Sequence, residues 1–130
     1  MKFDFVDQTV IVTGGTRGLG KSFFKLFLDN GAKVYATYAS NEAAAQAFVV
    51  ECGSLAEKLV TVKFDVSNYL GVEAFFAEFD KNNPRLDILI NNSGIRKDNV
   101  LVAMIIDDWS SVFSVNLTGT FNMCKFGVKS

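Results

Sequence analysis

A glycine-rich stretch near the N-terminus has the residue types and spacing that suit the binding of a pyrophosphate. Its glycines, Gly14, Gly15, Gly18 and Gly20, follow the apolar run 10–12 and precede a segment whose bulky residues have helical spacing. Gly14 allows a sharp turn after a strand, Gly18 presents no side chain to a phosphate, and Gly20 lets a helix pack closely on the strand. The first N–H groups of that helix would point at the phosphates. The stretch predicts a dinucleotide site, and a glycine-rich turn without a ligand is the alternative interpretation.

The order of residues in this stretch resembles that of a known family. Thr13 precedes the pattern G-x-x-x-G-x-G, in which Thr16, Arg17 and Leu19 fill the remaining positions of the loop. This pattern is similar to that of the short-chain dehydrogenases/reductases. The resemblance implies an α/β fold, a Rossmann-like doubly wound parallel sheet, with a nicotinamide dinucleotide bound over the glycines.

The end of the second expected strand indicates which cofactor is bound. In dinucleotide folds an acid about 20 residues after the glycines accepts a hydrogen bond from the ribose 2′-OH of NAD. Here the chain reads Thr37-Tyr38-Ala39-Ser40-Asn41, and Glu42 is expected in the next helix. No carboxylate stands here to repel a 2′-phosphate. Arg17 can supply positive charge to that phosphate, and Ser40 can supply a hydroxyl donor. Ala39 lies beside Ser40 in the same part of the site, between strand and helix. The sequence therefore favours NADP(H), although a solvated Arg17 is the alternative.

Two further strand ends carry polar residues that the resemblance places in the cofactor site. The third strand ends at Phe64-Asp65-Val66, where the family has an Asp that accepts from the adenine amino group. Asp65 can instead cap a turn near Ser67. The fourth strand ends at Asn91-Asn92-Ser93-Gly94, which is similar to the family's N-N-A-G with Ser in place of Ala. Its amides can tie neighbouring strands together and line the ribose, and Gly94 allows close approach of a ligand.

One residue of the expected last helix belongs to the catalytic class by resemblance. Asn116 stands in Val115-Asn116-Leu117, and Asn is a mediocre helix former. In the family an Asn at this position bends the helix and holds a water of the proton relay, whereas base rates alone favour a surface Asn. Trp109 fits the same segment and is interpreted as a packing anchor.

The family's proton donor, a Tyr with a Lys four residues later, has no match here. Residues Ala39, Glu42 and Glu73 stand four positions after the three tyrosines. The resemblance covers the first half of a family domain of roughly 250 residues, truncated after the helix that follows the fourth strand. We therefore expect the chain by itself to show no reductase turnover.

A loop after the fourth strand narrows the substrate class. The stretch Gly94-Ile95-Arg96-Lys97-Asp98-Asn99 resembles that of 3-oxoacyl-[acyl-carrier-protein] reductases, which implies NADPH-dependent reduction of a 3-oxoacyl thioester in fatty acid synthesis. Arg96 and Lys97 can meet an acidic acyl carrier protein or form a solvated loop. Acetoacetyl-CoA reductases and sugar-alcohol dehydrogenases share most of these motifs. A non-catalytic nucleotide-binding module, or one half of a split enzyme completed by another chain, remains the alternative function.

The elements that must position these residues alternate between strand and helix. Strands are expected at 9–12, 33–38, 59–64 and 87–90. Helices are expected at 18–29, at 41–52, from a cap at Ser67 to 79, and from near Trp109 to the end with Asp107 or Asp108 as cap. One dinucleotide-binding domain over residues 1–130 accounts for all of them.

Composition excludes several other classes. The 130 residues carry 13 basic and 14 acidic side chains without a block of one sign, so neither nucleic acid nor a membrane surface is indicated as a partner. The absence of His excludes His-based metal sites and Ser-His-Asp triads, and Cys52 and Cys124 are expected to be buried or unpaired thiols. No apolar run has the length of a signal or a membrane span, so a cytoplasmic location is expected. By resemblance the chain is expected to form homo-oligomers.

Overall fold

Four parallel strands form the centre of the described molecule. The computed structural model describes residues 3–16 and 18–130. The strand order is β3-β2-β1-β4, with Ile11 of β1 paired with Tyr35 of β2 on one side and with Leu89 of β4 on the other. The bounds of the strands are β1 Thr9–Val12, β2 Lys33–Tyr38, β3 Leu59–Lys63 and β4 Ile88–Ile90. The expected doubly wound parallel sheet is thereby confirmed. The strands are added outward from β1 in one direction as β2 and β3, and then in the opposite direction as β4, so the strand order reverses between β1 and β4.

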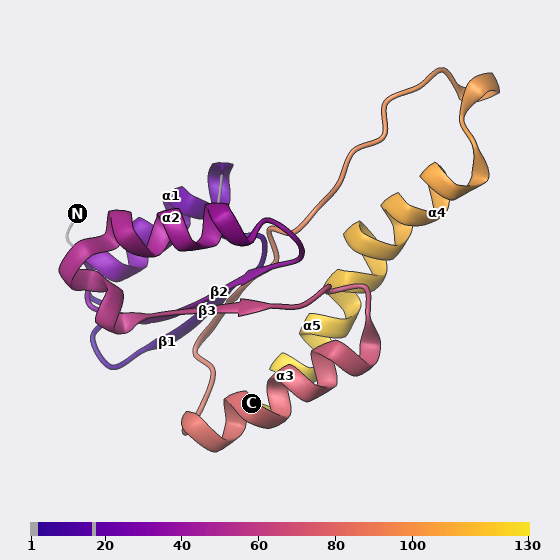
Figure 1. Ribbon diagram of the computed structural model, residues 1–130. Coiled ribbons are helices and arrows are strands. Elements are labelled where there is room, and N and C mark those ends of the chain that lie inside the picture. The colour runs from indigo at the N-terminus through magenta and orange to yellow at the C-terminus, as the bar shows by residue number, and fades with distance from the viewer. Residues whose placement is uncertain (1–2, 17) are drawn as a thin grey trace.

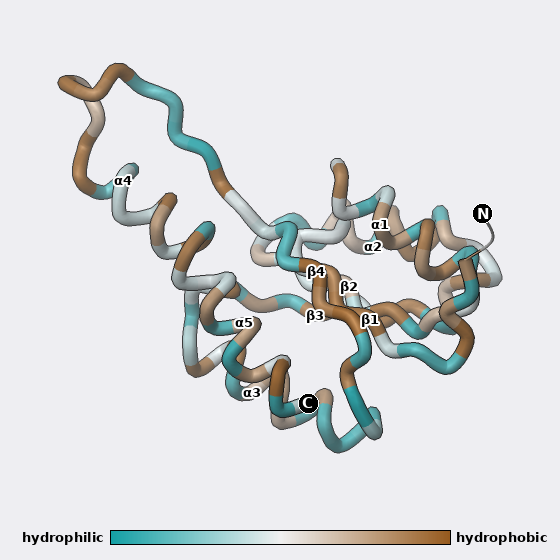
Figure 2. Tube along the Cα trace, turned by 180° about the vertical axis from the view of Figure 1, so that it is seen from behind, coloured by the Kyte–Doolittle hydropathy of each residue, from teal (hydrophilic) through white to brown (hydrophobic). Residues whose placement is uncertain are grey.

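Helices cover both faces of this sheet (Figure 1). On one face α1 and α2 pack on Val10, Val12 and Val34, and on the other α3 and α5 pack on Ile11 and Tyr35. Successive side chains of β1 thus enter opposite cores, as strand geometry requires. Figure 2 shows the resulting hydrophobic strands between the two helical layers. The helices of these layers are α1 Gly18–Asp29, α2 Glu42–Cys52, α3 Tyr69–Asn82 and α5 Gly119–Gly127.

Asparagine side chains cap two of the helices. The Asn41 side chain accepts from the Ala44 amide, and the Asn68 side chain accepts from the Gly71 amide, each at 3.0 Å. The prediction that Ser67 caps the third helix is therefore wrong, because the cap falls one residue later. The Ser67 hydroxyl instead donates to the Asp65 carboxylate at 2.7 Å.

The last expected helix is divided into three parts. α4 (Ile106–Phe113) continues into a π-helical turn, η3 (Ser114–Thr118), and then into α5. Asp107 and Asp108 lie in the first turn of α4, and neither side chain caps it, so that prediction is wrong. A short 3₁₀ helix, η2 (Leu101–Ala103), precedes α4, and this region projects away from the sheet (Figure 1).

An apolar stripe runs along the outer side of α4 and α5. Its members, which we call the outer stripe, are Trp109, Phe113, Leu117 and Phe121, and they are 44–61% exposed. Trp109, interpreted as a packing anchor, packs its ring on that of Phe113 with centroids 4.6 Å apart, and half of its surface stays exposed. The four residues recur every fourth position, which places them on one side of a helix.

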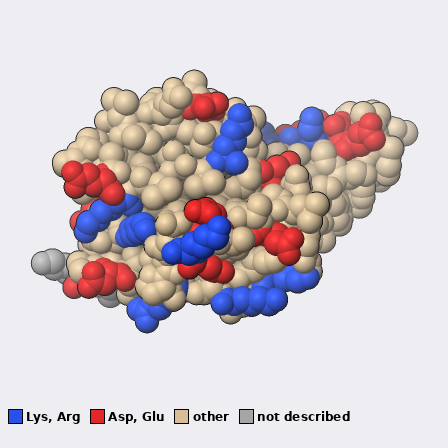
Figure 3. All heavy atoms as spheres, turned by 60° about the horizontal axis from the view of Figure 1, so that its bottom comes forward, with Lys and Arg blue, Asp and Glu red and all other residues tan. Residues whose placement is uncertain are grey.

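The charges of the molecule are mixed. Figure 3 shows acidic and basic side chains interspersed over the face that it presents. In the part of the chain that the structure describes, no helix combines the length and apolarity needed to span a bilayer. Within the same residues no group of three acids or cysteines is placed to hold a metal ion.

Candidate functional site

A cleft lies beyond the carboxyl ends of the strands, beside the reversal between β1 and β4. Its volume is about 520 Å³, within the roughly 300–1,000 Å³ of small-molecule sites. Open α/β sheets bind their ligands at this position. The lining residues are Gly14, Thr16, Gly18, Tyr38, Ala39, Ser40, Asn41, Phe64, Asp65, Val66, Asn92, Ser93, Gly94, Ile95 and Val115.

The glycine turn forms one wall of the cleft. Gly14 and Gly18 have φ values of +62° and +58°, which side-chain-bearing residues rarely adopt. A Cβ atom at Gly18 would meet nothing within 4 Å, so the backbone there is open to a ligand. A Cβ atom at Gly20 would lie 2.6 Å from the Gly14 carbonyl oxygen, so the absence of a side chain lets α1 approach the turn. This geometry agrees with the turn predicted at Gly14 and with the close packing predicted at Gly20, and the contact of Gly18 with a phosphate stays a prediction.

Hydrogen bonds join the ends of β1 and β4. The hydroxyl oxygen of Thr13, which is 1% exposed, accepts from the Asn92 and Ser93 amides at 3.0 and 2.9 Å. The Asn92 side chain donates to the carbonyl oxygens of Thr13 and Gly14, each at 3.1 Å. The predicted tie between strands is therefore present, and it depends on Thr13, to which sequence reasoning gave no role of its own.

The end of β2 contributes neutral groups to the cleft. Ala39, Ser40 and Asn41 line it. Glu42 lies in α2, and its Oε2 atom is 3.7 Å from the Lys63 Nζ atom. Among the described lining residues Asp65 is the one acid. Arg17, predicted to supply positive charge here, lies outside the described residues.

Asp65 forms the turn considered for it, and its contact with adenine stays a prediction. Its Oδ1 atom accepts from the Ser67 amide at 2.8 Å and from the Ser67 hydroxyl at 2.7 Å, which forms the turn before α3. Within the described residues its Oδ2 atom has no hydrogen-bond partner, and Asp65 lines the cleft. Turn formation therefore leaves one carboxylate oxygen available to a ligand.

Asn116 lies at the centre of the π-helical turn η3. Its side-chain Oδ1 accepts from the Ile95 amide at 2.8 Å, and its Nδ2 donates to the Ile95 carbonyl at 3.0 Å. Its own carbonyl accepts from the Thr120 hydroxyl at 3.0 Å. The helix is thus irregular at Asn116, and this residue fixes the loop that follows Gly94.

Not every predicted residue lines the cleft. Gly15 lies against the Phe24 ring, and Gly20 lies against the backbone of the turn. Leu19 points to solvent with 74% exposure, and Asn116 bonds to Ile95, which does line the cleft. The cleft also contains residues that sequence reasoning missed, namely Tyr38, Asn41, Phe64, Ile95 and Val115. All five end a predicted strand or stand beside a predicted residue, and that adjacency was the available signal.

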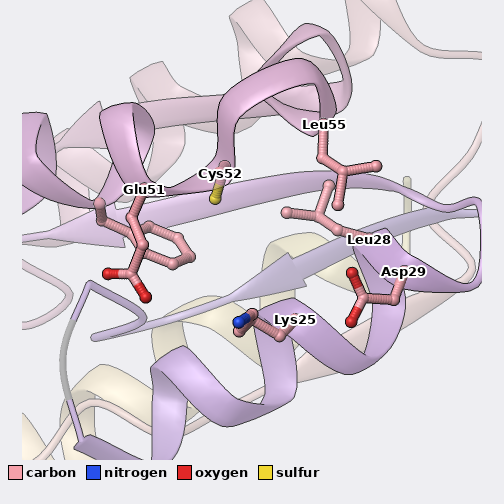
Figure 4. A pocket seen from close by; sticks show the side chains of 7 residues that line it. Lys25, Leu28, Asp29, Glu51, Cys52 and Leu55 are labelled. Carbon is pink, nitrogen blue, oxygen red and sulfur yellow. The ribbon is translucent and has the colours of Figure 1, made fainter.

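A second, smaller cavity lies between α1, α2 and the 3₁₀ helix η1 (Gly53–Lys58) (Figure 4). Its volume is about 220 Å³, below the usual range of ligand sites. Burial raises the pKa of the Cys52 thiol, and the neighbouring Glu51 charge adds to this rise. A hydrogen bond from Lys21 lowers the pKa of Glu51. The thiol is therefore a poor nucleophile at neutral pH, and this cavity lacks the features of a reactive site.

Both cysteines are free thiols. Cys124 is exposed, and its sulfur accepts from the Asn91 side chain at 3.3 Å. The expectation of unpaired thiols is confirmed, whereas burial applies only in part to Cys52 and not to Cys124.

The fold defines a Rossmann-like α/β protein with a cleft at the reversal of strand order. The family model described as short chain dehydrogenase matches residues 8–130. The chain belongs to the short-chain dehydrogenase family, whose members are oxidoreductases.

Curated relatives and solved structures agree with this assignment. The chain is 43% identical to 3-oxoacyl-[acyl-carrier-protein] reductase FabG of Chlamydia pneumoniae, over 96% of the chain and 50% of that protein. It is 37% identical to acetoacetyl-CoA reductase of Shinella zoogloeoides, over 91% of the chain and 47% of that protein. A short-chain dehydrogenase/reductase from Brucella melitensis matches with a TM-score of 0.91 and 31% identity, over 99% of the chain and 54% of that structure. A short-chain dehydrogenase from Burkholderia cenocepacia, in complex with NADP, matches with a TM-score of 0.89 and 26% identity, over 98% of the chain and 52% of that structure. The chain spans about half the length of the curated relatives it matches.

Proposed function

We propose that residues 1–130 form the dinucleotide-binding domain of an NADP(H)-dependent reductase that converts 3-oxoacyl thioesters to 3-hydroxyacyl thioesters. The observation that carries this proposal is the cleft at the strand reversal, where an open glycine turn faces Ser40 and Asp65. The NADP complex of the Burkholderia cenocepacia relative supports the choice of ligand.

The residues of the cleft fit such a cofactor. Gly18 leaves space at the start of α1, where backbone N–H groups and the helix dipole favour a pyrophosphate. The free Oδ2 atom of Asp65 accepts a hydrogen bond from the adenine amino group, and Asn92 with Gly94 lines the ribose side. When bound, the reduced nicotinamide supplies a hydride to the substrate carbonyl carbon.

Preference for the 2′-phosphate follows from the charges near the end of β2. The nearest acid in sequence, Glu42, faces Lys63 and does not line the cleft. Ser40 donates its hydroxyl to the phosphate, and Arg17 adds positive charge on the basis of its place in the glycine loop. A carboxylate at this position would instead repel the phosphate.

Asn116 has a role in proton supply within this proposal. Because its side chain is committed to Ile95, the relay water is held by the backbone carbonyl, whose partner in the structure is the Thr120 hydroxyl. The family's proton donor is the Tyr of a Tyr-x-x-x-Lys pair. We propose that turnover requires this pair, from the same polypeptide or from a complementing chain.

The substrate class rests on the relatives named above and on the loop that follows Gly94. Arg96 pairs with Asp98 at 2.7 Å, and Lys97 approaches Asp108 at 3.6 Å. Both cations therefore have acidic partners, which favours a solvated loop over a dedicated surface for acyl carrier protein. We propose the 3-oxoacyl thioester as the substrate. Its acyl group is carried by acyl carrier protein, the carrier in the name of the relative from Chlamydia pneumoniae.

The outer stripe supports the proposal that the protein forms homo-oligomers. Its four residues are apolar, aligned along α4 and α5, and 44–61% exposed. A stripe without charges is complementary to a second copy of itself across a twofold axis. In the family this helix packs between subunits, and we propose the same arrangement here.

Cofactor binding by the purified chain tests the proposed function. We expect saturable binding of NADPH, followed through nicotinamide fluorescence, with an affinity about tenfold or more above that for NADH. Ser40→Ala and Arg17→Ala are each expected to reduce this preference, because each removes a phosphate partner. Ser54→Ala, at an exposed serine of η1 outside the cleft, is the matched control and should leave both affinities unchanged.

Two results would contradict the proposal. Equal affinity for NADH and NADPH would remove the assignment of the 2′-phosphate site. The absence of saturable binding by a folded sample would leave the glycine turn without a ligand, which is the alternative drawn from the sequence.

A further inference from the structure

A buried asparagine of α5 lies behind the adenine end of the proposed cofactor site. Asn122 is 1% exposed, and its side-chain Nδ2 donates to the Val66 carbonyl oxygen at 2.9 Å. Its neighbour Met123 belongs to the apolar core on the α3 and α5 face of the sheet. An amide in such surroundings is costly unless it is hydrogen-bonded, so the bond to Val66 accounts for its presence there.

The same helix contacts the side chain of Val66 one turn earlier. A Cβ atom at Gly119 would lie 2.5 Å from Val66 Cγ2, so the helix backbone lies against this side chain. Gly119 and Asn122 thus hold Val66 by its side chain and by its carbonyl. Val66 itself is 4% exposed and also lines the cleft.

The segment held in this way carries the acid of the cleft. Asp65 precedes Val66, and its carboxylate forms the turn with Ser67 through Oδ1. The Asn68 amide donates to the Asp65 carbonyl at 3.0 Å, which completes a turn that is rigid within itself. These local bonds set the shape of the turn. Its position relative to the glycine wall depends on contacts from outside, namely the Phe64 amide, which donates to the Tyr38 carbonyl at 3.0 Å, and the two contacts of α5 with Val66.

We infer that Asn122 is a positioning residue that places the Asp65 carboxylate for recognition of the adenine amino group, an inference that rests on the proposed function. The hydrogen bond to Val66 sets the depth of the 65–68 turn in the cleft. Without it the turn keeps its internal bonds but shifts relative to the glycine wall. Because hydrogen bonds weaken steeply with distance and angle, a small shift reduces the contact of Oδ2 with the adenine.

The test compares two cofactors that differ only at the adenine amino group. NADPH and its purine analogue, in which a hydrogen atom replaces that group, are titrated into the wild-type chain and into Asn122→Ala. We expect the wild type to prefer NADPH by about tenfold, the size expected for one hydrogen bond to a charged group. In Asn122→Ala this preference should fall toward one, because only the contact through Asp65 distinguishes the two ligands.

Asn83→Ala is the matched control. Asn83 is also buried, at 7% exposure, and its side chain donates to the Tyr35 hydroxyl and to the Phe79 carbonyl, each at 2.9 Å. These partners lie outside the cleft, so this variant should lose stability but keep the preference for NADPH. A second variant, Asn122→Leu, keeps the branching and the number of side-chain heavy atoms without the donor, and it replaces Asn122→Ala should the latter not fold.

An unchanged preference in a folded Asn122 variant would overturn the inference. Failure of the wild type to bind either cofactor would instead contradict the proposed function. In that case amide hydrogen exchange without ligand decides. Faster exchange at Phe64, whose amide joins the start of the turn to the Tyr38 carbonyl, in the Asn122 variant than in Asn83→Ala supports the positioning role, and equal exchange overturns it.

Discussion

Gly20→Ala is expected to reduce the affinity for NADPH by about tenfold or more and the free energy of unfolding by about 1–3 kcal/mol. The added Cβ atom would lie 2.6 Å from the Gly14 carbonyl oxygen, 2.7 Å from the Asn92 side-chain nitrogen and 2.7 Å from the Gly15 Cα atom. Two of these neighbours are backbone atoms, and the third is the amide that ties β4 to the glycine turn. Helix α1 must therefore move away from the turn, which displaces the N–H groups proposed to face the phosphates.

Gly71→Ala is the control for this substitution. Gly71 is also near the start of a helix, but its Cβ atom would meet the Asn68 side chain at 3.4 Å, an ordinary contact. This variant should be more stable than the wild type by about 0.5–1 kcal/mol, because alanine favours the helix, and should bind NADPH unchanged. Chemical denaturation and fluorescence titration measure both quantities. Wild-type affinity in Gly20→Ala would show that α1 need not pack this closely.

Thr13→Val is expected to lower the free energy of unfolding by about 2–4 kcal/mol, since two partly buried N–H groups lose their acceptor. The Thr13 hydroxyl accepts from Asn92 and Ser93, whose amides have no comparable acceptor once it is gone. Valine occupies nearly the same space, so the loss comes from the hydrogen bonds and not from a cavity. Residues 92–94 should then move, and NADPH affinity should fall with them.

Two companion variants separate this effect from a general response to the substitution. Thr13→Ser restores the acceptor and should recover most of the stability. Thr61→Val makes the same change at a half-buried position of β3 and should alter stability by less than about 0.5 kcal/mol. Equal losses in Thr13→Val and Thr61→Val, measured by chemical denaturation, would contradict the role assigned to the Thr13 hydroxyl.

The strands were the most predictable part of the fold. The bounds predicted for β1 and β2 agree with the structure, because each is a short apolar run that is buried on both faces. Cap positions were less predictable. Ser67 and Asn68 are both good capping residues, and the choice between them depends on Asp65, which uses the Ser67 hydroxyl.

Much of the candidate site could be predicted because its polar residues follow the strand ends in sequence. The roles of Thr13 and Asn116 could not be predicted in full, because their partners lie far along the chain. Asn116 bonds to Ile95, which is 21 residues away, and no local pattern shows such a pair. Tyr38, Phe64 and Val115 line the cleft as apolar or aromatic groups, and such residues carry the same signal whether they face a core or a ligand.

The bonds between Thr13 and residues 92 and 93 also bear on how the protein folds. They join positions that are 79 and 80 residues apart in the chain. Contacts of such separation require closure of a long loop, and its entropic cost must be met before they contribute to stability. The two walls of the cleft therefore come together only when β4 docks on β1, so a partly folded chain that lacks this pairing has no cleft. A nucleotide that binds only the completed cleft draws the population toward the fully folded state by mass action.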